Sequence, residues 1–191
     1  LCDAATRDDL ARWNHPAWWV QRLRKDHPQH WQAVLQAPRN QAPMVLRINK
    51  QKTTPGQYQK ALAAINLGAI DIGADGLVLQ RAVAVQSLPG FAQGDVSVQD
   101  AGAQLAAPLL LQGLDLGRPL RVLDACAAPG GKTAHLLECA GPQADLRLTA
   151  LDVDAQRCER IRATLERCQL KAQVLVADAG RPEDWWRAHC G

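Results

Sequence analysis

The sequence has few aromatic side chains and no long apolar run. Aromatic residues make up 4% of its 191 residues, and six of the eight are tryptophan. No apolar stretch approaches the roughly 20 residues that a membrane-spanning helix needs, and the first residues lack the layout of a signal peptide. We therefore expect a cytoplasmic protein with no membrane partner.

The six cysteines do not occur at metal-binding or redox spacings. No two of them form a C-x-x-C pair, and none belongs to a recognisable zinc-ligand pattern. We therefore expect no metal. In a chain of this size, the pattern indicates reduced and mostly buried thiols. These residues are Cys2, Cys126, Cys139, Cys158, Cys168 and Cys190.

The net charge of +3 is unevenly distributed along the chain. Residues 1–60 carry ten basic and four acidic side chains, whereas residues 61–191 carry twelve basic and fifteen acidic ones. The basic front half predicts contact with a polyanion such as RNA. A solvated helical surface with no partner would have the same composition.

Residues 1–40 form the first predicted region, a helical segment. Apolar residues recur at helical spacing near 4–13, a second helix begins at Pro16, and a third follows Pro28. The tryptophans of this region are most simply the core of a small helical bundle. Stacking on nucleic-acid bases is the alternative interpretation.

Residues 41–90 form the second predicted region, a small α/β domain. MVLRIN (44–49) has the pattern of a strand, and a helix is expected from Thr54 to Gly68. Short apolar stretches at 77–79 and 83–85 complete a β-α-β pattern that is too short for a dinucleotide domain.

Basic side chains give this small domain a predicted positive edge. Arg47, Lys50 and Lys52 lie in and directly after its first strand. They favour an RNA-binding module, although a structural spacer would have the same pattern.

Residues 91–191 form the third region, which follows a boundary at SLPGFAQGD (87–95). Short apolar strands alternate here with helices, which predicts an α/β fold with a parallel sheet. Because a doubly wound sheet has the strand order 3-2-1-4-5, this stretch would supply strands one to three. The expected strands are 96–98, 120–123, 146–151 and 173–177, and the expected helices are 100–111, 130–139, 154–168 and a last one from Pro182.

DACAAPGGKT (124–133) ends like a phosphate-binding loop but lacks two features of one. Such a loop needs a glycine at position 126, where Cys126 stands. Pro129 has no N–H to donate to a phosphate, and Asp124 would repel a triphosphate. The dinucleotide fingerprint G-x-G-x-x-G is also absent.

Three consecutive strands each end at or near an acid, namely Asp124, Asp152 and Asp178. These acids would meet at the carboxyl edge of a parallel sheet, where open α/β sheets bind ligands. Small residues in the turn let a ligand approach the backbone, and Asp152 has the spacing of a ribose-binding acid. A cationic ligand that contains ribose fits this pattern, and S-adenosylmethionine is such a ligand.

The chain resembles the RNA cytosine-5 methyltransferases. DACAAPGGKT is similar to the cofactor loop of that family, and LDVD (151–154) and VADA (176–179) stand where the family has its second and third cofactor acids. HPAWWVQRL (15–23), MVLRIN (44–49) and LPGFAQGDVSVQD (88–100) also occur in the family's order, so the resemblance covers almost the whole chain.

The resemblance implies a truncated Rossmann-like methyltransferase sheet that binds S-adenosylmethionine, preceded by an RNA-facing α/β domain and a helical segment. It implies small-subunit ribosomal RNA as the substrate, and a protein that is a monomer when complete. Asp152 would hold the ribose hydroxyls, and Asp178 would lie near the adenine. The remaining residues implied to bind the cofactor are Cys126, Ala127, Ala128, Pro129, Gly130, Gly131 and Lys132.

The chain departs from the family in its cysteines. Family members use one cysteine after a proline and one after a threonine, and no cysteine here follows either residue. The family chemistry needs a thiolate that adds to cytosine C6, which makes C5 nucleophilic. We therefore expect no catalytic residue in this chain, which would be inactive alone. Two alternatives stay open, a non-catalytic RNA-binding module with a vestigial cofactor fold and a divergent P-loop nucleotide-binding protein.

Overall fold

The structure is a computed structural model that describes residues 9–189. The chain divides into two units, the first ending at Ala42 and the second beginning at Pro43, and each is described by itself. Within residues 9–189, no helix combines the length and the apolar character needed to cross a lipid bilayer.

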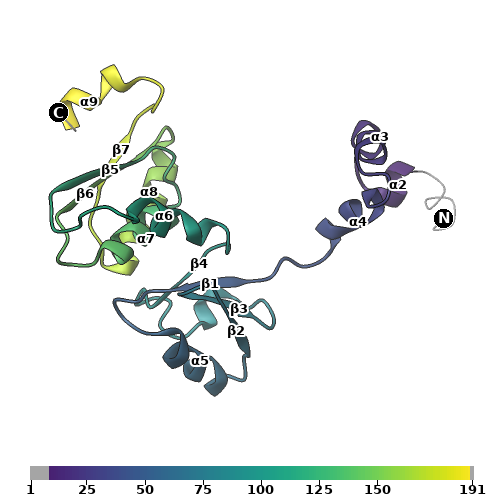
Figure 1. Cartoon of the computed structure of the whole chain (residues 1–191), viewed down its shortest axis with the longest axis horizontal. Helices are drawn as coiled ribbons and strands as arrows, with labels where there is room; N and C mark the ends of the chain where they lie inside the picture. Colours follow the sequence, from purple (N-terminus) through teal and green to yellow (C-terminus); the bar gives the residue numbers. More distant parts are fainter. Residues whose placement is uncertain (1–8, 190–191) are drawn as a thin grey trace. The chain divides into compact units, whose positions relative to one another are not determined.

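The first unit is helical, as the sequence predicts (Figure 1). The expected first helix near 4–13 corresponds to α2 (Asp9–Trp13), and its earlier part lies outside the described residues. The other two expected helices are α3 (Ala17–Asp26) and α4 (Trp31–Gln36), and a short 3-10 turn, η1 (Ala37–Arg39), follows.

Only some of the tryptophans form the core of this unit. Trp13 is buried with Val20, Leu23 and Leu35, and its ring meets that of Trp31 edge to face at 5.0 Å. By contrast, the side chain of Trp18 is 66% exposed. The buried stripe of α3 runs through Val20, and a residue two positions earlier lies about 200° away around a helix. The expectation that the tryptophans form the core of a small bundle is therefore met by Trp13 and Trp31 and wrong for Trp18.

The second unit begins with a four-stranded antiparallel sheet. Its order is β2-β3-β1-β4, and every neighbouring pair is antiparallel. Helix α5 (Pro55–Ala64) packs on one face through Tyr58 and Leu62. The strands are β1 (Val45–Ile48), β2 (Ala69–Ile72), β3 (Gly76–Leu79) and β4 (Val96–Val98).

Helix α5 begins as predicted but ends four residues before Gly68. Thr54 caps it, with a reciprocal bond between Thr54 and Gln57. The chain leaves the helix at Asn66, which has a φ of 55°, and the N–H of Leu67 donates to the carbonyl of Leu62 at 3.0 Å. This left-handed C-terminal turn, which asparagine tolerates, releases the chain early enough to form β2.

Two other expectations for this region were wrong. Residues 83–85 form no strand, and a 3-10 turn, η2 (Val85–Ser87), occupies part of that stretch. Strand β4 does form at 96–98, but it pairs with β1 and not with the parallel sheet. The antiparallel sheet therefore continues past the turn-rich stretch at 87–95.

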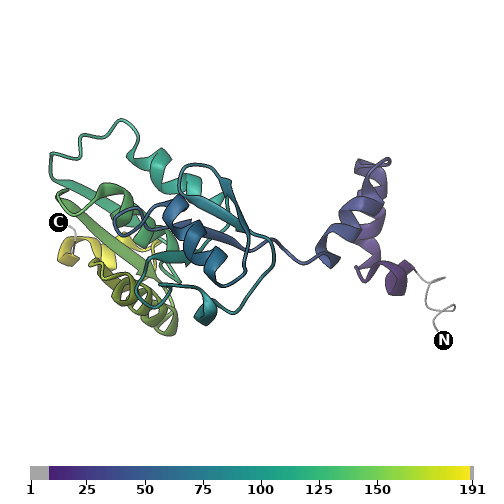
Figure 2. The ribbon, with the colours of Figure 1, turned by 90° about the horizontal axis from the view of Figure 1, so that it is seen from below.

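A three-stranded parallel sheet follows, in the order β5-β6-β7 that the doubly wound pattern predicts. Helices α7 and α8 connect its strands and share one apolar core with β6, and both views show α8 alongside the sheet (Figures 1 and 2). Asp154 caps α8 by accepting from the N–H of Arg157 at 3.1 Å. The elements are β5 (Leu120–Asp124), α7 (Gly131–Ala140), β6 (Leu146–Asp152), α8 (Ala155–Cys168) and β7 (Gln173–Val176).

The remaining helical expectations are met in shorter pieces. The expected helix at 100–111 divides into a 3-10 turn, η3 (Ala103–Leu105), and α6 (Ala106–Leu111). Past β7, the start of a helix at Pro182 is the 3-10 turn η4 (Pro182–Asp184), followed by α9 (Trp186–His189).

Strand β1 is buried on both faces, which determines what the antiparallel sheet can contact. Leu46 and Ile48 point into the core that includes α5. Because side chains alternate along a strand, Arg47 points to the opposite face. That face meets α7, since Arg47 forms an ion pair with Glu138 at 2.8 Å.

Candidate cofactor-binding site

The glycine turn between β5 and α7 is held on several sides by main-chain and side-chain bonds. The N–H of Ala127 donates to the carbonyl of Leu151 at 2.9 Å, which attaches the turn to β6. The hydroxyl of Thr164 donates to the carbonyl of Pro129 at 2.7 Å from α8. The turn is thus fixed at the carboxyl edge of the parallel sheet.

Gly130 occupies a position that only glycine fits well. Its φ of 97° lies in the left-handed region, and a Cβ there would stand 3.2 Å from the Cα of Ile161. The absence of a side chain therefore lets the turn lie directly on α8 before α7 begins.

Asp152 lies beside this turn, as predicted. It ends β6, its side chain is buried, and its Oδ2 accepts from the N–H of Ala128 at 3.3 Å. The other carboxylate oxygen accepts from the N–H of Asp154 at 3.2 Å. The carboxylate is thereby fixed in direct contact with the turn.

Asp124 and Asp178 lie at the same sheet edge but have different surroundings. The hydroxyl of Thr133 donates to Asp124 at 2.7 Å, so this acid anchors the first turn of α7. Asp178 is exposed and accepts from the N–H of Gly180 at 2.8 Å. The N–H of Ala177 donates to the carbonyl of Asp152 at 3.0 Å. Asp178 is the next residue in the chain, so it lies close to Asp152.

The remaining turn residues differ in exposure. Cys126, Pro129 and Lys132 are exposed, whereas Ala127 and Gly130 are buried. Among the described cysteines, Cys158 and Cys168 are buried and Cys139 is partly buried. The prediction of mostly buried thiols is therefore confirmed for these three, whereas Cys126 is exposed, and Cys2 and Cys190 lie outside the described residues.

Sequence reasoning missed a basic partner of the buried acid. The Nη2 of Arg157 lies 3.3 Å from the Oδ2 of Asp152. Arg157 stands in the first turn of α8, five residues after Asp152. This spacing across a helix start is a signal that could have indicated the contact.

The predicted positive edge of the small domain was wrong at Arg47. This side chain is 1% exposed and pairs with Glu138, so it cannot form part of an outer basic surface. The Nζ of Lys50 lies 4.0 Å from the Oδ2 of Asp75. The Nζ of Lys52 donates to the carbonyl of Gln93 and, at 3.0 Å, to the side chain of Gln169.

Helix α7 contains two buried ionisable groups next to Arg47. Burial, together with the charges of Arg47 and Lys50, lowers the pKa of His135 to about 3, so the imidazole is neutral near pH 7. Burial raises the pKa of Glu138, while the charge and hydrogen bonds of Arg47 oppose that effect.

Two family models match the chain at the places where this geometry lies. One, described as the ferredoxin-like domain of RsmF/B-like methyltransferases, matches residues 15–86. The other, described as 16S rRNA methyltransferase RsmB/F, matches residues 112–189, which include the glycine turn, Asp152 and Asp178. The chain belongs to the RsmB/F family.

Curated relatives in the RsmB/F family cover nearly the whole chain. Ribosomal RNA small subunit methyltransferase B of Vibrio cholerae is 43% identical over 186 residues, or 96% of this chain and 41% of that protein. The protein of the same name from Xanthomonas campestris is 46% identical over 95% of this chain and 40% of its own length. The chain thus spans about two fifths of the length of these relatives.

Solved structures show the same fold. A methyltransferase homolog protein from Pyrococcus horikoshii gives a TM-score of 0.74 at 23% identity, covering 92% of this chain and 57% of that one. NSun6 from the same organism gives 0.76 at 12% identity, covering 88% of this chain and 67% of that one. The RsmB/F chain is therefore an α/β protein with a ferredoxin-like domain followed by a truncated Rossmann-like methyltransferase sheet.

Proposed function

We propose that the complete protein is an S-adenosylmethionine-dependent methyltransferase that acts on cytosine C5 of small-subunit ribosomal RNA, and that this chain binds the cofactor. The observation that carries the proposal is the contact between the glycine turn and the buried carboxylate of Asp152 at the carboxyl edge of the sheet. Family membership and the relatives named above support the substrate class.

The residues at this edge fit such a cofactor in both shape and charge. Gly130 lets the turn lie directly on α8 beside Asp152, whose carboxylate would accept from ribose hydroxyls. Asp178, exposed at the end of the next strand, would lie near the adenine. We assign the stretch from Cys126 to Lys132 to the methionine and ribose end of the cofactor.

The methyl acceptor requires a thiol that we place outside this chain. When bound, the cofactor supplies a methyl group on a cationic sulfonium. Cys126 is the exposed cysteine of the turn. With the cofactor bound against the turn, its thiol would face the cofactor and not cytosine C6. The role that we assign to Cys126 is therefore to be small.

Calorimetric titration of the complete protein with S-adenosylhomocysteine tests the proposal. Asp152→Ala should weaken binding by about 1.5–3 kcal/mol, because hydrogen bonds to a charged group are lost. Asp154→Ala is the matched control. It removes a carboxylate two residues away that caps α8, which should cost about 1 kcal/mol of stability and leave the affinity unchanged.

Two results would contradict the proposal. Unchanged affinity in a folded Asp152→Ala protein would remove Asp152 from the site. Binding of ATP with magnesium in preference to S-adenosylhomocysteine would favour the P-loop alternative, against which Pro129 and Asp124 already argue.

A further inference from the structure

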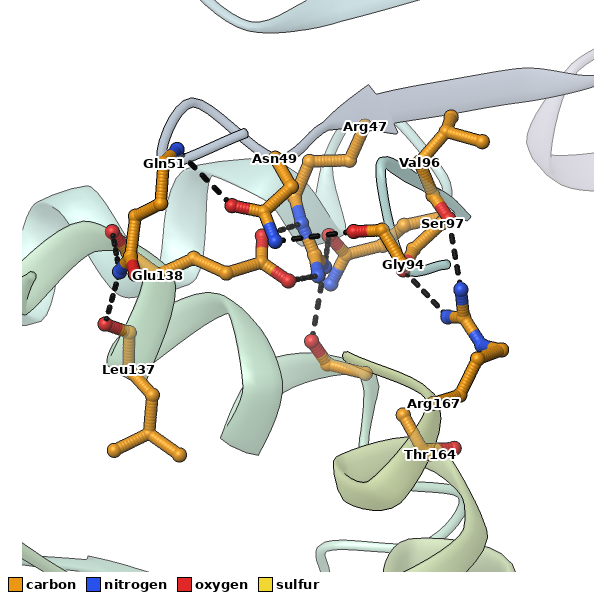
Figure 3. Close-up of polar contacts among 12 residues, drawn as sticks. Arg47, Asn49, Gln51, Gly94, Val96, Ser97, Leu137, Glu138, Thr164 and Arg167 are labelled. Carbon is orange, nitrogen blue, oxygen red and sulfur yellow. Dashed lines mark hydrogen bonds and ion pairs between the residues drawn. The ribbon is translucent and has the colours of Figure 1, made fainter. Parts of the chain in front are cut away.

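Arg47 links the ferredoxin-like domain to the helix that begins at the glycine turn (Figure 3). Its Nε and Nη2 donate to the two carboxylate oxygens of Glu138 at 3.0 and 2.8 Å. Its Nη1 donates to the side chain of Gln99 at 2.6 Å and to the carbonyl of Gly131 at 2.9 Å. One guanidinium therefore contacts both the first residue and the last part of α7.

The spacing of these contacts follows from helix geometry. Gly131, His135 and Glu138 are separated by four and then three residues, so they lie on one face of α7. Arg47 spans this face from Gly131 to Glu138, and the buried, neutral His135 lies between its two contacts. A positive charge on the imidazole of His135 would be repelled by the guanidinium of Arg47, which agrees with the lowered pKa of His135.

Neighbouring contacts hold α7 to the ferredoxin-like domain at its other end. The side-chain amide of Gln51 donates to the carbonyls of Leu137 and Glu138 at 2.9 and 2.8 Å, in the last turn of the helix (Figure 3). Helix α7 is thus fixed along its length by residues in or just after β1. Its first residue follows Gly130 directly, so the turn is held from the same side.

We propose that Arg47 is a positioning residue for the cofactor turn. It acts through the Gly131 carbonyl and does not touch the cofactor, and the ferredoxin-like domain thereby determines the geometry of the neighbouring site. This inference rests on the proposed function, in which the turn binds the cofactor. A structural role alone would require only the buried ion pair with Glu138, and not the bond to Gly131.

The ion pair and the bond to Gly131 can be separated by substitution. Arg47→Met alone leaves Glu138 buried without its partner and should destabilise the protein strongly. Arg47→Met with Glu138→Leu replaces the pair by apolar side chains, which commonly restores stability. The double variant still lacks the donor to Gly131, so its stability should recover while its cofactor affinity should not.

The experiment measures three quantities in the complete protein. These are stability in urea, affinity for S-adenosylhomocysteine, and amide hydrogen exchange of residues 126–131. In the double variant we expect stability near the wild-type value, affinity at least tenfold weaker, and exchange in the turn at least tenfold faster. Arg47→Lys, which keeps a charge for Glu138 but loses the planar fork, should show the same two losses.

Arg167→Met provides the matched control within the same interface. Arg167 donates to the carbonyl of Val96 at 3.0 Å and to Ser97 (Figure 3), and also to the carbonyl of Phe91 at 2.8 Å. These contacts do not involve α7. This variant should lose stability but keep cofactor affinity within twofold and exchange in the turn unchanged.

The outcomes separate this inference from the proposed function. Wild-type affinity and wild-type exchange of the turn in folded Arg47 variants would overturn the inference, while binding by the unsubstituted protein would leave the proposed function intact. Absence of binding by the unsubstituted protein would overturn the proposed function, and the inference with it. Equal loss of affinity in the Arg167→Met protein would show that any damage to the interface suffices, which also overturns a specific role for Arg47.

Discussion

At the scale of single residues, His135 makes stability depend on pH. Its pKa is about 3 in the folded protein and about 6.5 in an unfolded chain. Between these values the unfolded chain binds a proton that the folded protein does not, so stability rises with pH by about 1.4 kcal/mol per unit. This contribution is fully present above pH 6.5 and is lost progressively as the pH falls.

Urea unfolding at pH 7 and pH 5 should therefore show a difference that His135→Leu reduces by about 2 kcal/mol. His27→Gln, at an exposed position, is the control and should leave the difference unchanged. Glu138 acts in the opposite direction, because burial raises its pKa, so the comparison between proteins is the informative quantity. An identical pH dependence in the His135→Leu protein would show that this histidine is not the group that titrates.

At the scale of elements, local signals predicted what is encoded locally. Helix α8 was predicted at almost its observed bounds, because its apolar residues recur at helical spacing and Asp154 caps it. Strand β2 was missed, since Ile70 is 69% exposed and the strand lacks a buried apolar pattern. Strand β4 was predicted as a strand, but the choice of its partner depends on a pairing with β1 about 50 residues away.

The sequence also predicted part of the arrangement of the candidate site. The acids at strand ends are visible in the sequence, because parallel strands bring their carboxyl ends together. The burial of Arg47 was not predicted, since a basic residue in a short strand has the pattern of an exposed edge. Period-two alternation identifies the face of Arg47 as opposite to Leu46 and Ile48, but only the fold shows that Glu138 lies there.

The contact of the glycine turn with α8 gives a prediction at this scale. Gly130→Ala should cost about 1–3 kcal/mol of stability and weaken binding of S-adenosylhomocysteine, because its Cβ would approach Ile161 and Thr164 to within 3.2 and 3.3 Å. Gly141→Ala is the matched control, since it has a φ of 81° but nothing within 4 Å of the added atom. If both variants lose equal stability and neither loses affinity, backbone strain alone accounts for the effect and the close approach does not matter for binding.

At the scale of the whole molecule, the ferredoxin-like domain and the parallel sheet are joined by buried polar contacts. One of these contacts is the ion pair between Arg47 and Glu138. The backbones also pack closely, because a Cβ added at Gly94 would lie 2.7 Å from backbone atoms of Arg167 and Cys168. Such close backbone approach and bonded charges indicate that the domains hold one fixed arrangement here. If the turn binds the cofactor as proposed, we expect substitutions in the ferredoxin-like domain to alter cofactor affinity without touching the cofactor.

The last prediction concerns residues 1–191 by themselves. Within the described residues, β5 pairs only with β6, and one sheet face carries a hollow of about 480 Å³ bordered by Leu123, Thr149 and Trp186. A strand with an unpaired edge is a template for association, and no cysteine of the sequence follows a proline or a threonine. We therefore predict that this chain alone transfers no labelled methyl group to small-subunit RNA, and that it associates in sedimentation experiments.

The complete protein is the positive control in the same assay. Methyl transfer above a no-protein blank would contradict the prediction and would make Cys126 a candidate nucleophile, which Cys126→Ser would then test.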